Sequence, residues 1–276
     1  METQNHQILE DLGNKYLKEK NYTKAKKYFK ILSKNYNSDI AQYNLGIIYK
    51  QEKKYLKSKK YFELAAEKNN TNALMKLGII YRDGLGVKKE PTKTFKYFEL
   101  AAKLGNANAL FYLGVFYQDG LGIKQNINRS RRYYKLAAQH NISEAMINLG
   151  LYYVNENNIE LAKYYWGISN NSKAQYNLGI LYQNEKNYKE AKKYYELAAE
   201  QNHSEAILAI GKLYLNGFGV EENINIALDY IIKAARLGNN NALQIINEAV
   251  EAVEGANEEF EIENIKNKMR CSYKAC

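Results

Sequence analysis

Ala41-Gln-Tyr-Asn-Leu45-Gly46-Ile-Ile-Tyr49 is the clearest copy of a phrase that occurs seven times along the chain. If Ala41 is counted as position 3, the shared Ala, Leu, Gly and Tyr stand at positions 3, 7, 8 and 11, on one face of an α-helix. Successive copies are 33, 32, 36, 36, 29 and 32 residues apart, and periods in this range predict a solenoid of helical pairs. The shared glycines are Gly13, Gly46, Gly78, Gly114, Gly150, Gly179 and Gly211.

A second helix follows the phrase in every copy, as in Ser58-Lys-Lys-Tyr61-Phe62-Glu-Leu-Ala65-Ala66. A glycine inside a helix costs about 1 kcal/mol relative to alanine, so its return at one position indicates close helix packing. We expect the shared glycine to face a small residue of the second helix, one of Ala65, Ala101, Ala137, Ala198 and Ala234. The predicted fold is all-α: a right-handed superhelical α-solenoid of antiparallel helix pairs, with about seven repeats and C-terminal capping helices.

The start of each second helix is marked by a candidate N-cap, four residues before a small residue. Asparagine is a preferred cap because its side chain accepts a hydrogen bond from a backbone N–H that has no partner within the helix. Where Glu90 holds this place, Pro91 follows at the first helical position, which tolerates proline. The seven residues are Asn21, Lys54, Glu90, Asn126, Asn158, Asn187 and Asn223.

The spacing also predicts the repeat boundaries and two kinds of connection. Three copies have a longer connection, at 83–87, 119–123 and 216–220, in which glycines allow positive φ and one apolar residue packs back. In the fifth copy only 12 residues separate Ala162 from Ala174, which predicts a shortened second helix. We place the repeats at 6–38, 39–70, 71–106, 107–142, 143–171, 172–203 and 204–239, the capping helices at 240–270 and a flexible tail at 271–276.

The longer copies, with Ala-x-x-x-Leu-Gly-x-x-Tyr, Gly-x-Gly-Val and Tyr-Phe/Tyr-x-x-Ala-Ala, resemble the Sel1-like repeat (SLR), a 36-residue relative of the tetratricopeptide repeat (TPR). The shorter copies, with phrases such as Lys186-Asn187-Tyr188-Lys189-Glu190-Ala191, resemble ordinary TPR units. The resemblance covers about residues 6 to 253. It implies an adaptor or scaffold that binds other proteins.

Composition fits a water-soluble array. The chain of 276 residues has 46% hydrophobic content but no apolar run long enough to span a membrane. Its first residues lack the basic start and apolar run of a secretory signal, so we expect a cytoplasmic protein. We also expect it to be a monomer. The two cysteines, Cys271 and Cys276, have no nearby His pair and are expected to be exposed thiols, not a zinc site.

No catalytic constellation is visible. His6, His140 and His203 fall at repeat ends, have no nucleophile motif beside them, and are expected to be exposed turn residues. The Gly-x-Gly connections lack the preceding strand and the Lys-Ser/Thr of a phosphate-binding loop. We therefore expect a non-enzymatic protein without metal or cofactor.

Binding is expected on the concave face, at positions 5, 6, 9 and 12 of the first helix, which turn away from the packed face. The expected occupant is a peptide or helix of a partner protein. Amide side chains of this face would pair with its main chain, and the cations would favour its acidic side chains. The alternative is that tight winding buries this face within the array. The candidate residues are Tyr43, Asn44, Ile47, Met75, Lys76, Arg82, Phe111, Tyr112, Gln118, Asn148, Tyr176, Asn177, Gln183 and Lys212.

Three further interpretations are open. The net charge of +10 could engage nucleic acid, but the lysines are spread over both helices like solvated faces, so this alternative is disfavoured. The chain could instead be a non-catalytic subunit of an enzyme complex. The acidic segment 248–263 could cap the array or occupy the groove.

The recurrent tyrosines of both helices are expected to pack between repeats.

Overall fold

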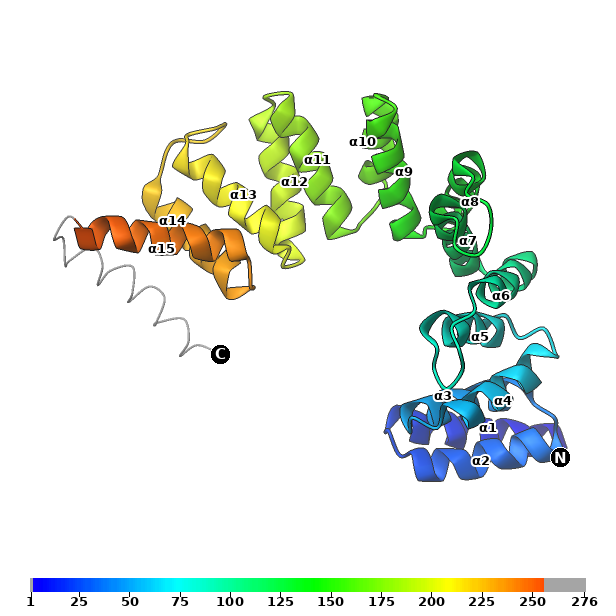
Figure 1. The fold of residues 1–276 in the computed structure, drawn as a ribbon. Coiled ribbons are helices and arrows are strands. Elements are labelled where there is room, and N and C mark those ends of the chain that lie inside the picture. Colours follow the sequence, from blue (N-terminus) through cyan, green and yellow to red (C-terminus); the bar gives the residue numbers. More distant parts are fainter. Residues whose placement is uncertain (1, 256–276) are drawn as a thin grey trace. The chain divides into compact units, whose positions relative to one another are not determined.

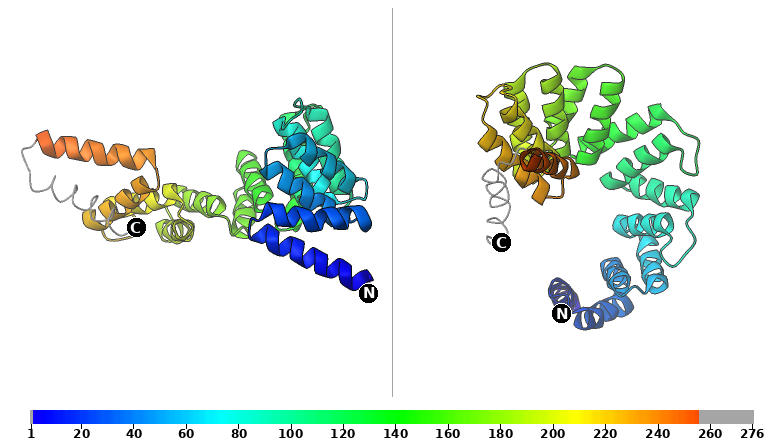
Figure 2. Two further views of the ribbon diagram at one scale, coloured as in Figure 1. Left: turned by 90° about the horizontal axis from the view of Figure 1, so that it is seen from below. Right: turned by 60° about the vertical axis from the view of Figure 1, so that its left-hand side comes forward.

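The computed structural model describes residues 2–255, which form 15 α-helices and no strand (Figure 1). The all-α prediction is confirmed. Helices follow one another in chain order as packed pairs, as the further views in Figure 2 also show. No helix in this part of the chain is both long and apolar enough to cross a membrane.

The chain divides into two compact units, Met1–Ala145 and Met146–Cys276. The helices of the first unit are α1 (Glu2–Lys18), α2 (Tyr22–Asn35), α3 (Asp39–Gln51), α4 (Tyr55–Ala66), α5 (Thr71–Asp83), α6 (Pro91–Lys103), α7 (Ala107–Asp119) and α8 (Ile127–Gln139). Those that follow are α9 (Ser143–Asn155), α10 (Ile159–Gly167), α11 (Ser172–Asn184), α12 (Tyr188–Glu200), α13 (Ser204–Leu215), α14 (Ile224–Arg236) and α15 (Asn240–Gly255). Odd-numbered helices from α1 to α13 carry the shared phrase, and even-numbered helices are their partners.

Six of the seven shared glycines face aromatic rings, not the small residues of the second helix. A Cβ atom at Gly13 would lie 2.7 Å from Phe29, and one at Gly46 would lie 2.5 Å from Phe62. Close packing was predicted correctly, but its partner was wrong, because Phe62 and Ala65 lie three residues apart on the same helical face. The rings over the first six glycines are Phe29, Phe62, Phe98, Tyr134, Trp166 and Tyr195.

The predicted caps are found where asparagine is present. Each asparagine side chain accepts a hydrogen bond from the backbone N–H two or three residues into its helix, as Asn126 does from Arg129 at 2.9 Å. Lys54 and Glu90 make no such bond, and Pro91 begins α6 as expected. The starts of α4 and α6 are therefore uncapped by side chains.

The recurrent tyrosines pair within repeats and also pack between repeats, as predicted. In every repeat the position-11 ring stacks on a ring of the second helix, with centroids 5.3 to 6.0 Å apart. Between repeats, the ring of Phe95 meets that of Tyr117 edge-on at 5.6 Å, and the Nζ of Lys59 lies 5.9 Å from the ring centroid of Tyr81. The pairs are Tyr16–Tyr28, Tyr49–Tyr61, Tyr81–Tyr97, Tyr117–Tyr133, Tyr153–Tyr165, Tyr182–Tyr194 and Tyr214–Tyr230.

The longer connections fasten each repeat to the preceding one. Gly86 has φ of +69°, and a Cβ there would lie 2.8 Å from the Cβ of Tyr55 at the start of α4. On either side of it, Leu85 and Val87 pack against the core that contains Phe62. The predicted packing of apolar residues from these connections is thus found.

Two helices of the second unit, the short α10 and the C-terminal α15, can be compared with the sequence predictions. α10 has only nine residues, as the short spacing predicts, and the buried hydroxyl of Ser169 just beyond it has no hydrogen-bond partner among the described residues. At the other end, α15 buries Ala242 and Ile246 against the core of α12 to α14, as a cap should. The rest of the predicted capping region and the tail lie outside the described residues.

Candidate functional site

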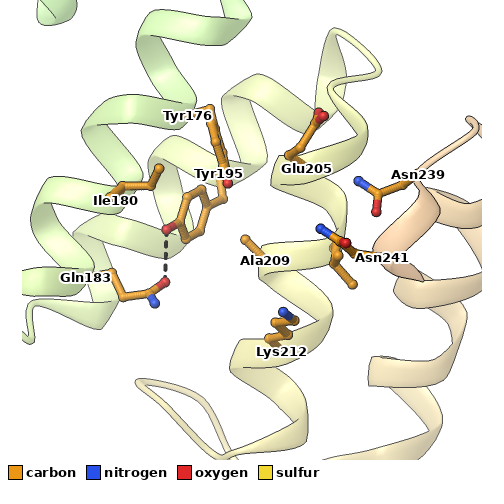
Figure 3. Close-up of a pocket in the computed structure, with 10 residues that line it drawn as sticks. Tyr176, Ile180, Gln183, Tyr195, Glu205, Ala209, Lys212, Asn239 and Asn241 are labelled. Atoms are coloured by element: carbon orange, nitrogen blue, oxygen red, sulfur yellow. Dashed lines mark hydrogen bonds between the residues drawn. The ribbon is translucent and has the colours of Figure 1, made fainter. Parts of the chain in front are cut away.

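A pocket of about 220 Å³ lies in the second unit, between α11, α13 and the start of α15 (Figure 3). It brings together three of the predicted concave residues, Tyr176, Gln183 and Lys212. The full lining consists of Tyr176, Ile180, Gln183, Tyr195, Glu205, Leu208, Ala209, Lys212, Asn239 and Asn241.

Helical spacing explains why these side chains converge. Tyr176, Ile180 and Gln183 stand at i, i+4 and i+7 on α11, so they share one face. Residues 205, 209 and 212 repeat this spacing on α13 and present Glu205, Ala209 and Lys212. The pocket therefore has an apolar floor with polar groups around it.

The polar groups differ in how far the fold already uses them. The oxygen of the Gln183 amide accepts a hydrogen bond from the hydroxyl of Tyr195 at 2.9 Å, which leaves the amide nitrogen for another partner. Asn239 uses its side-chain oxygen to cap α15 at Ala242, at 3.0 Å. Lys212 is exposed, and its ammonium group has no partner within residues 2–255. The pocket thus offers one cation, the carboxylate of Glu205 and amide donors.

His203 stacks on the pocket-lining Tyr176 and is not the exposed turn residue expected. Its Nδ1 accepts a hydrogen bond from the N–H of Ala206 at 3.4 Å, and its ring stacks on Tyr176 with centroids 4.8 Å apart. Burial lowers the pKa of His203 and raises the pKa of Tyr176, which Glu205 raises further. The neutral imidazole is the form that can accept the cap bond.

Several predicted residues of the first unit are used for packing. Met75 is 7% exposed and lies in the core with Phe98. Asn44 is 9% exposed and donates to the side-chain oxygen of Asn14 at 3.5 Å. Tyr43 lies half-buried against Phe62, and its pKa is raised by burial. For Asn44 and Met75 the alternative of burial within the array describes the structure better.

Other predicted residues bond within the array. Arg82 donates to both carboxylate oxygens of Asp83, at 2.7 and 3.2 Å, and its guanidinium lies 5.5 Å from the ring centroid of Tyr112. Gln118 accepts from the hydroxyl of Tyr134 at 2.9 Å, as Gln183 does from Tyr195. Arg82 and Gln118 thus already have partners within the array, whereas the sequence predicts that they contact a partner protein.

The remaining predicted residues lie outside the pocket. Ile47 and Phe111 are half-buried beside aromatic neighbours, and Lys76 is half-buried with a pKa lowered by burial and then by Lys50. Asn148 and Asn177 are half-buried and do not line the pocket.

Sequence reasoning missed Glu205 and Asn241, which share position 2 of the first helix. Position 2 lies three residues before position 5 and seven before position 9, so it belongs to the same helical face. Extending the face by one turn would have found both. Tyr195 was missed because it belongs to the second helix.

Comparisons with solved structures support the fold. The chain is 23% identical to c5321, a protective antigen present in uropathogenic Escherichia coli strains that displays an SLR fold; the match covers 96% of this chain and 61% of that one, with a TM-score of 0.78. A Sel1 repeat protein from Oxalobacter formigenes is 25% identical over 82% of this chain and 98% of its own, with a TM-score of 0.69. Pseudomonas aeruginosa pilF is 21% identical, covering 76% and 97%, with a TM-score of 0.56. This chain thus spans about three fifths of the length of c5321.

Comparison with family models gives the identity of the repeats. No curated protein sequence matches the chain. The tetratricopeptide repeat model matches residues 40–72. The Sel1 repeat model matches residues 12–36, 71–106, 107–142, 143–168, 172–203 and 204–239. Since these six matches cover most of the sequence and agree with the helix pairs, the chain belongs to the Sel1 repeat family.

Proposed function

We propose that the chain is a non-enzymatic scaffold or adaptor that holds a short peptide segment of a partner protein in the pocket between α11, α13 and α15. Sel1 and tetratricopeptide repeats generally serve as protein-interaction scaffolds. The observation that carries the proposal is the pocket itself, in which Lys212 and the amide nitrogen of Gln183 surround an apolar floor.

The size and chemistry of the pocket favour a peptide. Pockets for drug-sized ligands or cofactors measure about 300 to 1,000 Å³, and this one is smaller, at about 220 Å³. It suits one side chain and the main chain around it. Amide groups pair with peptide N–H and C=O groups, and Lys212 favours an acidic side chain or a terminal carboxylate.

The test uses peptides selected from a random display library against the full chain, with affinities measured by calorimetry. Lys212→Ala should weaken acidic peptides about tenfold, because hydrogen bonds to charged groups contribute about 1.5 to 3 kcal/mol. Ala209→Phe should fill the pocket and abolish binding. The matched control is Lys233→Ala, since Lys233 is also an exposed lysine of the second unit.

The proposal fails if no peptide is selected, or if selected peptides bind the Ala209→Phe and wild-type chains equally. Circular dichroism and thermal melting of each variant separate loss of the pocket from loss of the fold.

A further inference from the structure

Charge is divided very unevenly between the two units. Residues 1–145 contain 27 Lys and Arg against 13 Asp and Glu, a net charge of +14. Residues 146–276 contain 13 against 17, a net charge of −4. The basic character of the chain therefore belongs to the first unit alone.

Much of this charge lies in a regular pattern on the second helices of the first four repeats. Each of these helices carries an exposed cation at the third helical residue and another three residues later. Neighbours at i and i+3 lie on one side of a helix, about 5 to 6 Å apart. We call these eight residues the cationic strip: Lys24, Lys27, Lys57, Lys60, Lys93, Lys96, Arg129 and Arg132. The same positions in the second unit hold Leu161, Tyr164, Glu190, Lys193, Ile226 and Asp229.

The first cation of each helix in the strip stands near the helix N-terminus, where the helix dipole disfavours positive charge. A helix N-terminus carries partial positive charge, so a cation in the first turn costs about 0.3 to 1 kcal/mol where an acid would stabilise. No acidic residue occupies the first turn of α2, α4, α6 or α8. In the second unit, Glu160 and Glu190 occupy the first turns of α10 and α12, and α14 has no acidic residue there. A departure from a local rule in four successive repeats indicates a functional surface.

The first cation of each helix, which we call the first row of the strip, lies against a ring of a stacked tyrosine pair. The charged groups of Lys24, Lys57, Lys93 and Arg129 lie 5.0 to 5.9 Å from ring centroids of their own repeats. Because these tyrosine rings are already stacked on one another, they are not available to stack on the bases of a nucleic acid. The second row, Lys27, Lys60, Lys96 and Arg132, makes no hydrogen bond or ion pair within the described part of the chain.

Contacts join neighbouring repeats along the strip. Glu52 pairs with Lys26 of α2 and with Lys54 at the start of α4. The connection at Gly86 seats on the start of α4, and that at Gly122 seats on the start of α6. These contacts hold the successive repeats that carry the strip against one another.

The middle of the strip also presents backbone donors. The start of α4 has no side-chain cap. A shallow, open depression lies there, lined by Lys53, Lys54, Tyr55, Leu56, Lys57 and Gly86. Backbone N–H groups at a helix start, surrounded by lysines, form a site for a phosphate oxygen.

We propose that the cationic strip binds the phosphodiester backbone of a nucleic acid without reading its sequence. Lysines, arginines and helix N-termini are the groups that contact phosphates, and each nucleotide supplies one charge along a linear chain. The sequence disfavours nucleic acid because its lysines are spread over both helices of the repeats, but in the structure eight cations of the second helices form the strip. An acidic peptide has no fixed charge period, and a membrane would require contiguous exposed apolar side chains, whereas the eight positions of the strip hold only cations.

The experiment measures fluorescence anisotropy of the full chain with a labelled 30-nucleotide single strand of thymidine and with a 30-base-pair duplex, over a series of salt concentrations. We expect binding to both, with the logarithm of the affinity falling linearly with that of the salt concentration. The variant Lys27→Gln/Lys60→Gln/Lys96→Gln/Arg132→Gln removes the second row, which has no internal partner to lose. It should weaken binding at least about tenfold and reduce the salt slope for single strands by up to about 2.8, at about 0.7 per phosphate contact.

The matched control Lys34→Gln/Lys173→Gln/Lys189→Gln/Lys233→Gln removes the same number of charges at exposed lysines outside the strip. It should keep most of the affinity and the slope. Equal loss in both variants would show a general charge effect and overturn the proposal, as would no binding of either nucleic acid at 50 mM salt. Binding only to polyglutamate or to phosphatidylserine vesicles would replace nucleic acid by an acidic protein or a membrane. Ala209→Phe should leave nucleic-acid binding unchanged, so the two proposals can fail separately.

Discussion

At the scale of the residue, His203 stands where five of the other first helices carry asparagine or serine. Ser38, Asn70, Asn106, Asn171 and Asn239 cap their helices through side-chain oxygens, whereas His203 accepts through a ring nitrogen. Burial lowers the pKa of His203 below its ordinary value, because the charged form is penalised. The neutral ring both fits the wall and keeps the cap.

His203 should therefore make stability depend on pH. Its contribution is present above the unfolded pKa of about 6.5 and is lost as pH falls below that value toward the folded pKa. We expect the free energy of unfolding to fall by about 1 kcal/mol from this site on acidification, the value of a typical cap. His203→Asn should remove this component while keeping the cap. Urea denaturation at pH 7.5 and 5.5 measures it, with His140→Asn at an exposed position as the control; an unchanged pH dependence in His203→Asn would contradict the assignment.

At the scale of the element, the helix pair α11–α12 is joined by the hydrogen bond from Tyr195 to Gln183. The ring is buried over Gly179, and burial raises the pKa of its hydroxyl. Gln183→Leu should cost about 1 to 3 kcal/mol, because it leaves a buried hydroxyl without a partner. Adding Tyr195→Phe should restore most of the loss, since the first three repeats carry phenylalanine there and no glutamine at position 12.

A double-mutant cycle on the free energy of unfolding tests this coupling. Gln118 and Tyr134 of α7 and α8 provide the same pair in another repeat and should behave alike. Additive effects of the two substitutions would show that the hydrogen bond contributes nothing to stability.

Local features of each element could be predicted from sequence, and contacts between elements less so. The asparagine caps and the short α10 follow from residues near one another in the chain. The ring over each glycine could not be predicted, because Phe62 and Ala65 share one helical face and periodicity cannot choose between them. For the site, Tyr176, Gln183 and Lys212 were found from helical spacing. The internal partner of Gln183 was missed, although glutamine at position 12 occurs only where tyrosine replaces phenylalanine over the glycine.

At the scale of the whole molecule, the uneven charge predicts how stability responds to salt. The first unit carries a net charge of +14, and its cations repel one another and the helix N-termini beside them. Salt screens such exposed charges, with a Debye length of about 30 Å at 0.01 M and about 10 Å at 0.1 M. The melting temperature should therefore rise with sodium chloride between 10 and 300 mM.

The cationic strip should account for much of this salt response. Lys27→Gln/Lys60→Gln/Lys96→Gln/Arg132→Gln should melt at a higher temperature than wild type at 10 mM salt and respond less to added salt, because it relieves repulsion among the cations of the first unit. The four-lysine control lies partly on the acidic second unit, where removing cations leaves carboxylates less balanced, so it should not gain stability at low salt. Scanning calorimetry of the three chains measures the difference. If the strip variant is less stable than wild type at low salt, the strip side chains have a packing role in the fold, and the argument that they are held there at a cost to stability is wrong.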